Sequence, residues 1–247
     1  MGTTGAPAEM SEAPKSLGAR LVGVFFSPGE TFEDIARKPD WIAPLVLMTI
    51  VSIAGMEIFL NKIGVRPIIE WALEHSKNPQ TLPPEQLDRA AQIQTLFFHA
   101  LGVLATPVEA LALAGIGLLI VNVILGGKIS FKTAFAVACY ANVVTIVGAI
   151  VGVVMVLAGG PEHIISNPQN PTPLSLGFFL DPLETSKPLL SLGGSIDVMT
   201  FWFMGMLGVG YSRAAGGKVK TASVFLIFLA IWIVWVLIKM GLSTLGS

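Results

Sequence analysis

The chain has 247 residues, of which 53% are hydrophobic and only 13% are charged, and its formal net charge is −1. A mean hydropathy of +0.74 is too high for a soluble globular protein. The sequence has no basic stripe with interleaved aromatic residues, which argues against a nucleic-acid partner. Its single cysteine, Cys139, excludes an intrachain disulfide and a cysteine-based metal site. We therefore predict an integral membrane protein whose first partner is the lipid bilayer.

Residues 1–14 lack the apolar core of a cleavable signal peptide, and we interpret them as a disordered tail. Residues 15–40 predict two cytoplasmic amphipathic helices. The apolar positions of the first share one face, with Arg20 on another: Leu17, Leu21, Val24 and Phe25. The second is expected to begin with a capping box formed by Ser27 and Glu30. It has an inward or lipid-facing set, Phe32, Ile35 and Ala36, and a water-facing set, Glu33, Asp34, Arg37 and Lys38. Two interpretations stay open, an anchor in the membrane interface and a docking surface for a partner.

Five apolar stretches of about bilayer-crossing length follow, and each is expected to be helical because lipid offers the backbone no hydrogen-bond partner. They cover about residues 41–60, 97–125, 134–158, 189–211 and 221–238 of a transmembrane domain at 41–240, followed by a C-terminal tail at 241–247. The predicted fold class is all-α, a polytopic five-helix bundle. Nine Lys and Arg residues fall on the side of the N-terminus and six on the other, which predicts a cytoplasmic N-terminus and an outer C-terminus.

The connections on the outer side are long. In residues 61–96 we predict two helical pieces, around 67–76 and 84–96, the second continuing into the second span. Residues 159–188 contain six prolines and are expected to be irregular, with 174–180 able to dip into the membrane interface.

Polar residues in the spans are the candidate functional groups. Glu109 lies near the middle of the second span, where a charged acid costs about 2.5–3.5 kcal/mol of insertion free energy. It is either a functional carboxyl or a protonated acid bonded to a neighbouring helix. Asn122 lies about 140° around the same helix, so this span alone has no continuous polar lane. Asp197 is expected to cap or start the fourth span.

The third span has a stripe of small residues with two polar members, Asn142 and Thr145. The candidate helix-packing positions in this stripe are Ala138, Ala141, Gly148, Ala149 and Gly152. Three interpretations stay open: a buried contact within the chain, a homodimer contact, and a narrow polar path beside Asn142 and Thr145.

Two inner turns are similar to each other at an offset of 90 positions. One is Gly126-Gly127-Lys128-Ile129 and the other is Gly216-Gly217-Lys218-Val219. Either spans two–three and four–five are repeated hairpins, or Gly and Lys recur because both segments are tight turns.

Three groups of residues resemble bacterial members of the Yip-one (Yip1) domain family, the Ypt/Rab-interacting membrane proteins. The first runs from Phe26 to Phe32 and continues with Pro39-Asp40-Trp41 and Pro44-Leu45; the second is Gly126-Gly127-Lys128 with Ser130-Phe131-Lys132; the third runs from Ile196 to Trp202 and continues with Gly208 and Tyr211-Ser212-Arg213. The resemblance covers roughly residues 25–238. It implies a five-helix membrane bundle with a cytoplasmic N-terminal segment, here in a bacterial cytoplasmic (inner) membrane.

The resemblance also bears on partners. Eukaryotic members are scaffolds of vesicle traffic that engage small GTPases, but this chain has neither their long N-terminal region nor a trafficking motif, so a small GTPase is not expected. His75, His99 and His163 are scattered, and the HExxH, P-loop, GxGxxG and GxSxG motifs are missing, so we expect neither an enzyme nor a cofactor. We predict a non-catalytic organiser or accessory of membrane protein and lipid assemblies, with other membrane proteins as partners and homo-oligomerisation left open. The alternative is a small channel, transporter or lipid-moving protein with a polar path near Glu109 and Asn142.

Overall fold

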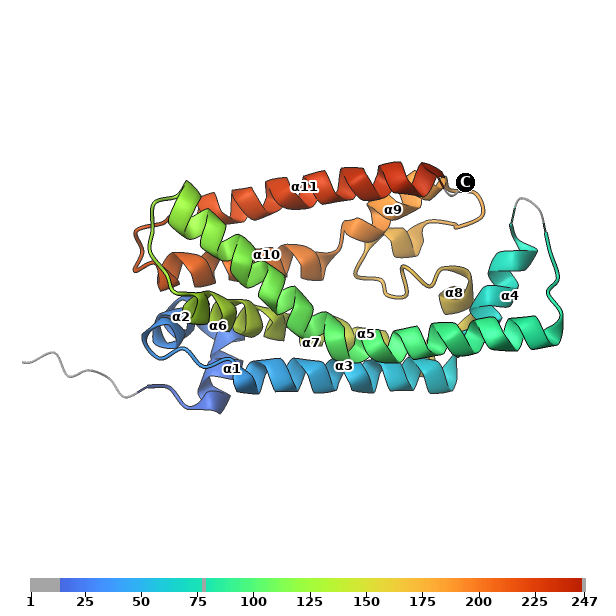
Figure 1. Cartoon of the computed structure of the whole chain (residues 1–247), viewed down its shortest axis with the longest axis horizontal. Coiled ribbons are helices and arrows are strands. Elements are labelled where there is room, and N and C mark those ends of the chain that lie inside the picture. Colours follow the sequence, from blue (N-terminus) through green and yellow to red (C-terminus); the bar gives the residue numbers. More distant parts are fainter. Residues whose placement is uncertain (1–13, 77–78, 246–247) are drawn as a thin grey trace, which may run out of the picture.

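The computed structural model describes residues 14–76 and 79–245, and over these residues the fold is a helical bundle without strands (Figure 1). The predicted disordered tail falls outside the described residues, except for its last position. In chain order the elements are α1 (Leu17–Phe26), α2 (Pro28–Arg37), α3 (Ile42–Lys62), α4 (Arg66–Glu74), α5 (Pro84–Leu118), the π-helix η1 (Leu119–Ile124), α6 (Phe131–Asn142), the 3₁₀-helix η2 (Val143–Thr145), α7 (Ile146–Ala158), α8 (Pro161–Ser166), the 3₁₀-helix η3 (Leu176–Phe179), α9 (Lys187–Ser195), α10 (Val198–Ala214) and α11 (Thr221–Leu245).

Four helices among the described residues are long and apolar enough to cross a membrane. They are Ile42–Lys62, Pro84–Ile124, Phe131–Ala158 and Thr221–Thr244. The helical piece expected at 84–96 does run without interruption into the second span, because α5 and η1 form one long rod. Helix α11 continues to Leu245 and does not end near residue 238, so most of the predicted C-terminal tail is helical.

Residues 189–211 do not form one continuous helix, but the prediction that Asp197 caps or starts a helix in this segment is confirmed. The chain leaves α9 at Ile196, and α10 begins at Val198 with Asp197 as its N-cap. The break is stable because the freed backbone groups find partners: Leu176 N–H donates to Ile196 O at 3.0 Å, and Val198 N–H donates to Leu174 O at 3.0 Å. Non-helical backbone at membrane depth is tolerated only where protein covers it in this way. Helix α10 has 17 residues and is not among the four long spans.

The bundle has two distinct ends (Figure 1). We call the end where α3 begins, beside α1 and α2, the N-terminal end, and the end where α3 finishes, beside α4 and α8, the loop end. Both Gly-Gly turns lie at the N-terminal end, whereas the C-terminus and residues 159–186 lie at the loop end. The helix ends therefore alternate as the predicted topology requires.

Helix α6 is the core of the N-terminal end. Every residue from Thr133 to Asn142 is buried, so α6 is covered all round and not on one stripe. Its neighbouring helices in contact are α1, α2, α3, α5 and α10. The two N-terminal helices are thus part of the bundle, packed against its core, and are not detached arms.

Candidate functional site

The site is built on the hairpin formed by α1 and α2. Ser16 caps α1 by accepting the Ala19 N–H at 3.3 Å, and Pro28 occupies the first position of α2, where a missing N–H costs nothing. Gly23 lets the two helices approach, because a Cβ at this position would collide with the Thr31 hydroxyl. Phe32 is fully buried under Gly210 of α10. The hairpin is therefore fixed on the bundle by close contact.

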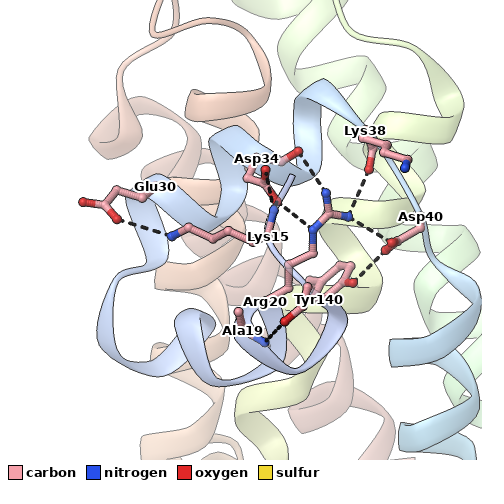
Figure 2. A network of polar contacts seen from close by, with 9 residues as sticks. Lys15, Ala19, Arg20, Glu30, Asp34, Lys38, Asp40 and Tyr140 are labelled. Atoms are coloured by element: carbon pink, nitrogen blue, oxygen red, sulfur yellow. Dashed lines mark hydrogen bonds and ion pairs between the residues drawn. The ribbon is translucent and has the colours of Figure 1, made fainter. Parts of the chain in front are cut away.

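Arg20 is the centre of the polar network in Figure 2. Its side chain is only 2% exposed. Nε donates to Asp34 Oδ2 at 2.7 Å, and Nη1 donates to Asp40 Oδ2 at 2.9 Å and to the Lys38 carbonyl at 3.0 Å. Nη2 donates to the Asp34 carbonyl at 3.3 Å. One guanidinium thus joins α1 to α2 and to the segment that leads into α3.

The amphipathic pattern was wrong on this point, since it assigned Arg20 to a face apart from the buried one and Asp34 to the water-facing set. Both are buried, and they neutralise each other. Burial by itself would lower the pKa of Arg20, but hydrogen bonding to Asp34 and the charges of Asp34 and Asp40 outweigh it, so the pKa lies above its ordinary value. The arginine is a permanent cation inside the fold. The inward placement of Phe32 and Ile35 is confirmed.

Two further contacts tie this network to distant parts of the chain. The Tyr140 hydroxyl of α6 donates to Asp40 Oδ1 at 2.7 Å, as Figure 2 shows. At the far side of the hairpin, Arg213 of α10 pairs with Glu33 at 3.1 Å and lies against Gly29. In the first half of α6, the Phe135 ring meets Trp41 edge to face with centroids 5.2 Å apart. Residues far apart in sequence therefore meet around α2.

Tyr211 joins α10 to α5 and α6 beneath this layer. Its fully buried hydroxyl lies 2.8 Å from the Leu113 carbonyl of α5 and 3.3 Å from the Ala134 carbonyl of α6. Gly117 leaves room for the ring, because a Cβ there would overlap it. The first and third motifs thus meet in space, where Arg213 lies against Gly29, and the second reaches the first through Phe135, which contacts both Phe131 and Trp41.

The sequence model of the Yip1 domain matches residues 22–245, which is nearly the whole described chain. The chain belongs to the Yip1 domain family. No curated protein and no solved structure is significantly similar to it. Within this Yip1 protein, the matched region includes the second half of α1 from Val22 onward, α2 and the membrane helices, whereas Arg20 lies two residues before its start.

The polar residues predicted in the second and third spans do meet. Asn142 Nδ2 donates to Glu109 Oε2 at 3.3 Å, and the Thr145 hydroxyl donates to Asn142 Oδ1 at 2.9 Å. Glu109 itself is exposed on the outside of α5, whereas Asn142 is buried. Thr145, Asn142 and Glu109 thus form a short series of hydrogen-bonded side chains that ends at the surface of the bundle.

Glu109 lies closer to the N-terminal end than its place in the predicted span suggested. Gly102 packs on Ile53 and Met56, and His99 pairs with Glu57 at 2.9 Å, which sets the antiparallel register of α3 and α5. Glu109 is about two turns further along α5 than Gly102, so it lies roughly one turn inside the start of α3. The depth of Glu109 in the membrane stays a prediction, because α5 extends beyond α3 at both ends.

The two Gly-Gly turns are closed by the same contact. Asn122 Nδ2 donates to the Ile129 carbonyl at 3.0 Å, and Ser212 Oγ donates to the Val219 carbonyl at 2.6 Å. These pairs are 90 positions apart, like the turn sequences themselves. Gly126 and Gly216 also match, with φ of 67° and 65°, which glycine adopts without strain. Gly127, Gly217, Lys128 and Lys218 complete the two turns.

The small residues of the third span fall into two groups that differ in burial. Ala138 and Ala141 are fully buried in α6. Gly148, Ala149 and Gly152 lie half-buried on α7, where a Cβ on Gly148 would come within 3.1 Å of Met199 and one on Gly152 within 3.8 Å of Thr172. In this chain the stripe therefore contacts α10 and the loop before α9.

Sequence reasoning missed Arg20, Asp34, Tyr140 and Tyr211 as site residues. A signal was present for the first, since one arginine in the middle of the otherwise apolar α1 needs a partner. Among the described residues, no three His, Cys, Asp or Glu side chains lie together as metal ligands. The donors and acceptors of the Arg20 network satisfy one another, an arrangement suited to holding a surface in place.

Proposed function

We propose that this Yip1 protein organises or assists assemblies of membrane proteins, with the α1–α2 hairpin as its presenting surface and other membrane proteins as its partners. The observation that supports this is a contrast within α1. One side is locked into the bundle by Arg20 and Val24, whereas the other exposes Val22 at 58% and Phe26 at 85%. A fixed hairpin that keeps large apolar side chains exposed is suited to binding. Such a role needs no catalytic group.

We further propose that α10 and α9 together complete a fifth crossing, with the N-terminal end in the cytoplasm of a bacterial cell and the C-terminus outside. The excess of Lys and Arg in the segments at the N-terminal end supports this orientation. Single cysteines at Ser130 and Ser166 test it, because these residues begin α6 and end α8 at opposite ends of the bundle. An impermeant thiol reagent should label the cysteine at 166 in intact cells and the cysteine at 130 only after lysis. The opposite pattern contradicts the proposal.

Photo-crosslinking in native membranes tests the presenting surface. A photoreactive residue at position 22 or 26 should crosslink to discrete protein partners identified by mass spectrometry. The matched control is Ile50, which is 58% exposed on α3 and should yield lipid adducts. Lipid adducts alone at all three positions would instead identify α1 as an interfacial anchor and reject the organiser proposal.

A second function is favoured by one observation, the exposure of Glu109 on the surface of α5. A small channel or lipid-moving protein would use this carboxyl and Asn142 as part of a polar path. Flux of protons, small cations or fluorescent lipids in reconstituted vesicles separates the two. The organiser proposal expects no robust flux, with stability preserved in Glu109→Gln and reduced by about 1 kcal/mol in Glu109→Leu through the lost bond to Asn142. Wild-type flux abolished by Glu109→Gln would replace it with the transport function.

A further inference from the structure

The loop end holds a cavity that the organising role does not use. It has a volume of about 450 Å³, opens to the surface, and is lined by α4, α8 and the segment around η3. Helices α4 and α8 lie next to each other there (Figure 1). Its lining includes four ring side chains and one carboxylate: Trp71, His163, Phe178, Phe179 and Asp181. A volume of this size accommodates a small organic group.

Three of the four rings form a series of contacts, and Trp71 stacks on the neighbouring His75. His163 packs on Phe178 with ring centroids 4.2 Å apart, and Phe178 meets Phe179 edge to face at 5.2 Å. Trp71 is stacked on His75 at 4.6 Å, with the rings 19° from parallel. His163 is further oriented by the Asn170 carbonyl, 3.4 Å from Nε2. The aromatic lining is thus pre-arranged by the fold.

The charge at the cavity is negative. Among the described residues that line it none is Lys or Arg, and the one charged side chain is Asp181. Leu183 N–H donates to Asp181 Oδ1 at 2.7 Å, which fixes the carboxylate at the rim and uses one of its several acceptor positions. Aromatic faces attract cations, and several rings beside a carboxylate are the chemistry that selects ammonium groups over anions and neutral molecules.

We propose that this cavity binds a substituted ammonium group, of the kind found in choline and ethanolamine. The cavity lies next to the ends of α3 and α7, so such a group can arrive on a lipid headgroup at the membrane surface or as a free cation. Trp71 and Phe178 supply the ring faces and Asp181 supplies the counter-charge. The site is separate from the α1–α2 hairpin, and the proposal does not depend on the proposed function.

Binding of soluble probes to the purified protein in detergent tests the chemistry. Choline and its uncharged carbon analogue 3,3-dimethylbutanol have nearly the same shape, so calorimetric titration of both isolates the contribution of charge. The wild type should bind choline saturably and the analogue roughly tenfold more weakly, a ratio expected from a cation–π site. Phe178→Leu and Asp181→Asn should each weaken choline binding by a similar factor. The control Asp88→Asn removes an acid from the same end outside this cavity and should change nothing.

A lipid arm distinguishes the two sources. Native mass spectrometry of protein from nanodiscs with equal phosphatidylethanolamine and phosphatidylglycerol should show retained phosphatidylethanolamine, lost in Asp181→Asn, if the group arrives on a lipid. Saturable choline binding without selective lipid retention would identify a free cation as the source. The proposal is overturned if choline and its uncharged analogue bind with equal affinity. It is also overturned if the wild type shows neither saturable choline binding nor selective lipid retention, provided that the wild type and the variants have the same melting temperature.

Discussion

The two ends of the bundle each contain an arginine that pairs with two carboxylates, and the pairs differ in burial. At the N-terminal end Arg20 binds Asp34 at 2.7 Å and Asp40 at 2.9 Å, and its side chain is 2% exposed. At the loop end Arg66 binds Glu70 at 3.0 Å and Asp88 at 2.6 Å, and its side chain is 46% exposed. Judged by their ion-pair distances alone, the two clusters would be expected to contribute equally to stability.

This contrast shows that burial, and not ion-pair geometry, decides what such a cluster does. Arg20 and Asp34 are shielded from water, so removing Arg20 leaves the Asp34 carboxylate without its cation in a medium of low dielectric constant. Around Arg66 water and salt replace any lost partner. The N-terminal end is therefore fixed, whereas the loop end is held by exchangeable contacts and retains an open cavity.

The largest expected effect is that of Arg20→Met. It leaves Asp34 buried without its cation, and we expect a loss of about 3 kcal/mol in stability, the lower end of the range for broken buried pairs because Asp40 stays half exposed. Thermal melting in detergent measures it, and protease cleavage between α2 and α3 should increase. If Arg20→Met had the same melting temperature as the wild type, the arginine clusters at the two ends would not differ in their contribution to stability.

Gly148→Leu should cause the second-largest loss of stability. It tests the packing of α7, which passes from one end of the bundle to the other. The new side chain would enter space occupied by Met199 and Leu174, an overpacking that costs about 1–3 kcal/mol. Gly152→Leu is the matched control, since only Thr172 lies within 4 Å of its Cβ position, and it should cost less. Unchanged melting in both variants would place this face of α7 against lipid.

The turn contacts offer a smaller effect within the N-terminal end itself. Ser212→Ala removes a buried hydrogen bond and should cost about 1 kcal/mol, whereas Asn122→Ala acts at an exposed turn and should cost less. Thermal melting in detergent compares the two variants. Equal loss of stability in both would mean that burial does not rank these contacts.

The smallest effect is expected for Arg66→Met. Its exposed pairs with Glu70 and Asp88 are screened by solvent, so the melting temperature should be nearly unchanged at physiological salt. Measurement at low and high salt should show at most a slight difference at low salt. A loss comparable to that of Arg20→Met would remove the distinction between the two ends.

Hydropathy was sufficient to predict the membrane helices that stay continuous. It placed α3, the long α5 rod and the start of α11, because about twenty apolar residues have few alternatives to a membrane helix. It failed at residue 196, where Leu189–Leu192 and Val198–Phe203 are apolar on both sides of a break that only Gly193-Gly194 and the capping residue Asp197 indicate. A window average does not detect two residues that leave the helix.

The candidate site was predictable only in part, because pairing depends on neighbours from other helices. Glu109 was expected to need a partner, but the sequence alone does not indicate that this partner is Asn142, 33 positions away. Arg20 and Asp34 were assigned to polar faces because a helical wheel treats each helix alone, whereas opposite charges on two helices can share one buried face. Nothing in the sequence around Tyr211 predicts that its hydroxyl contacts backbone carbonyls of α5 and α6.

The contacts around α2 also impose an order on synthesis. The bond between Tyr140 and Asp40 needs only the first three spans, but the contacts of Glu33 with Arg213 and of Phe32 with Gly210 need α10. At about 5–20 residues per second, the ribosome takes several seconds to make the intervening segment. During that interval every residue of the Arg20 network has been synthesised, while the side of α2 that contacts α10 still lacks its partner. An insertion factor or chaperone that shields nascent membrane proteins would find that surface free until α10 arrives.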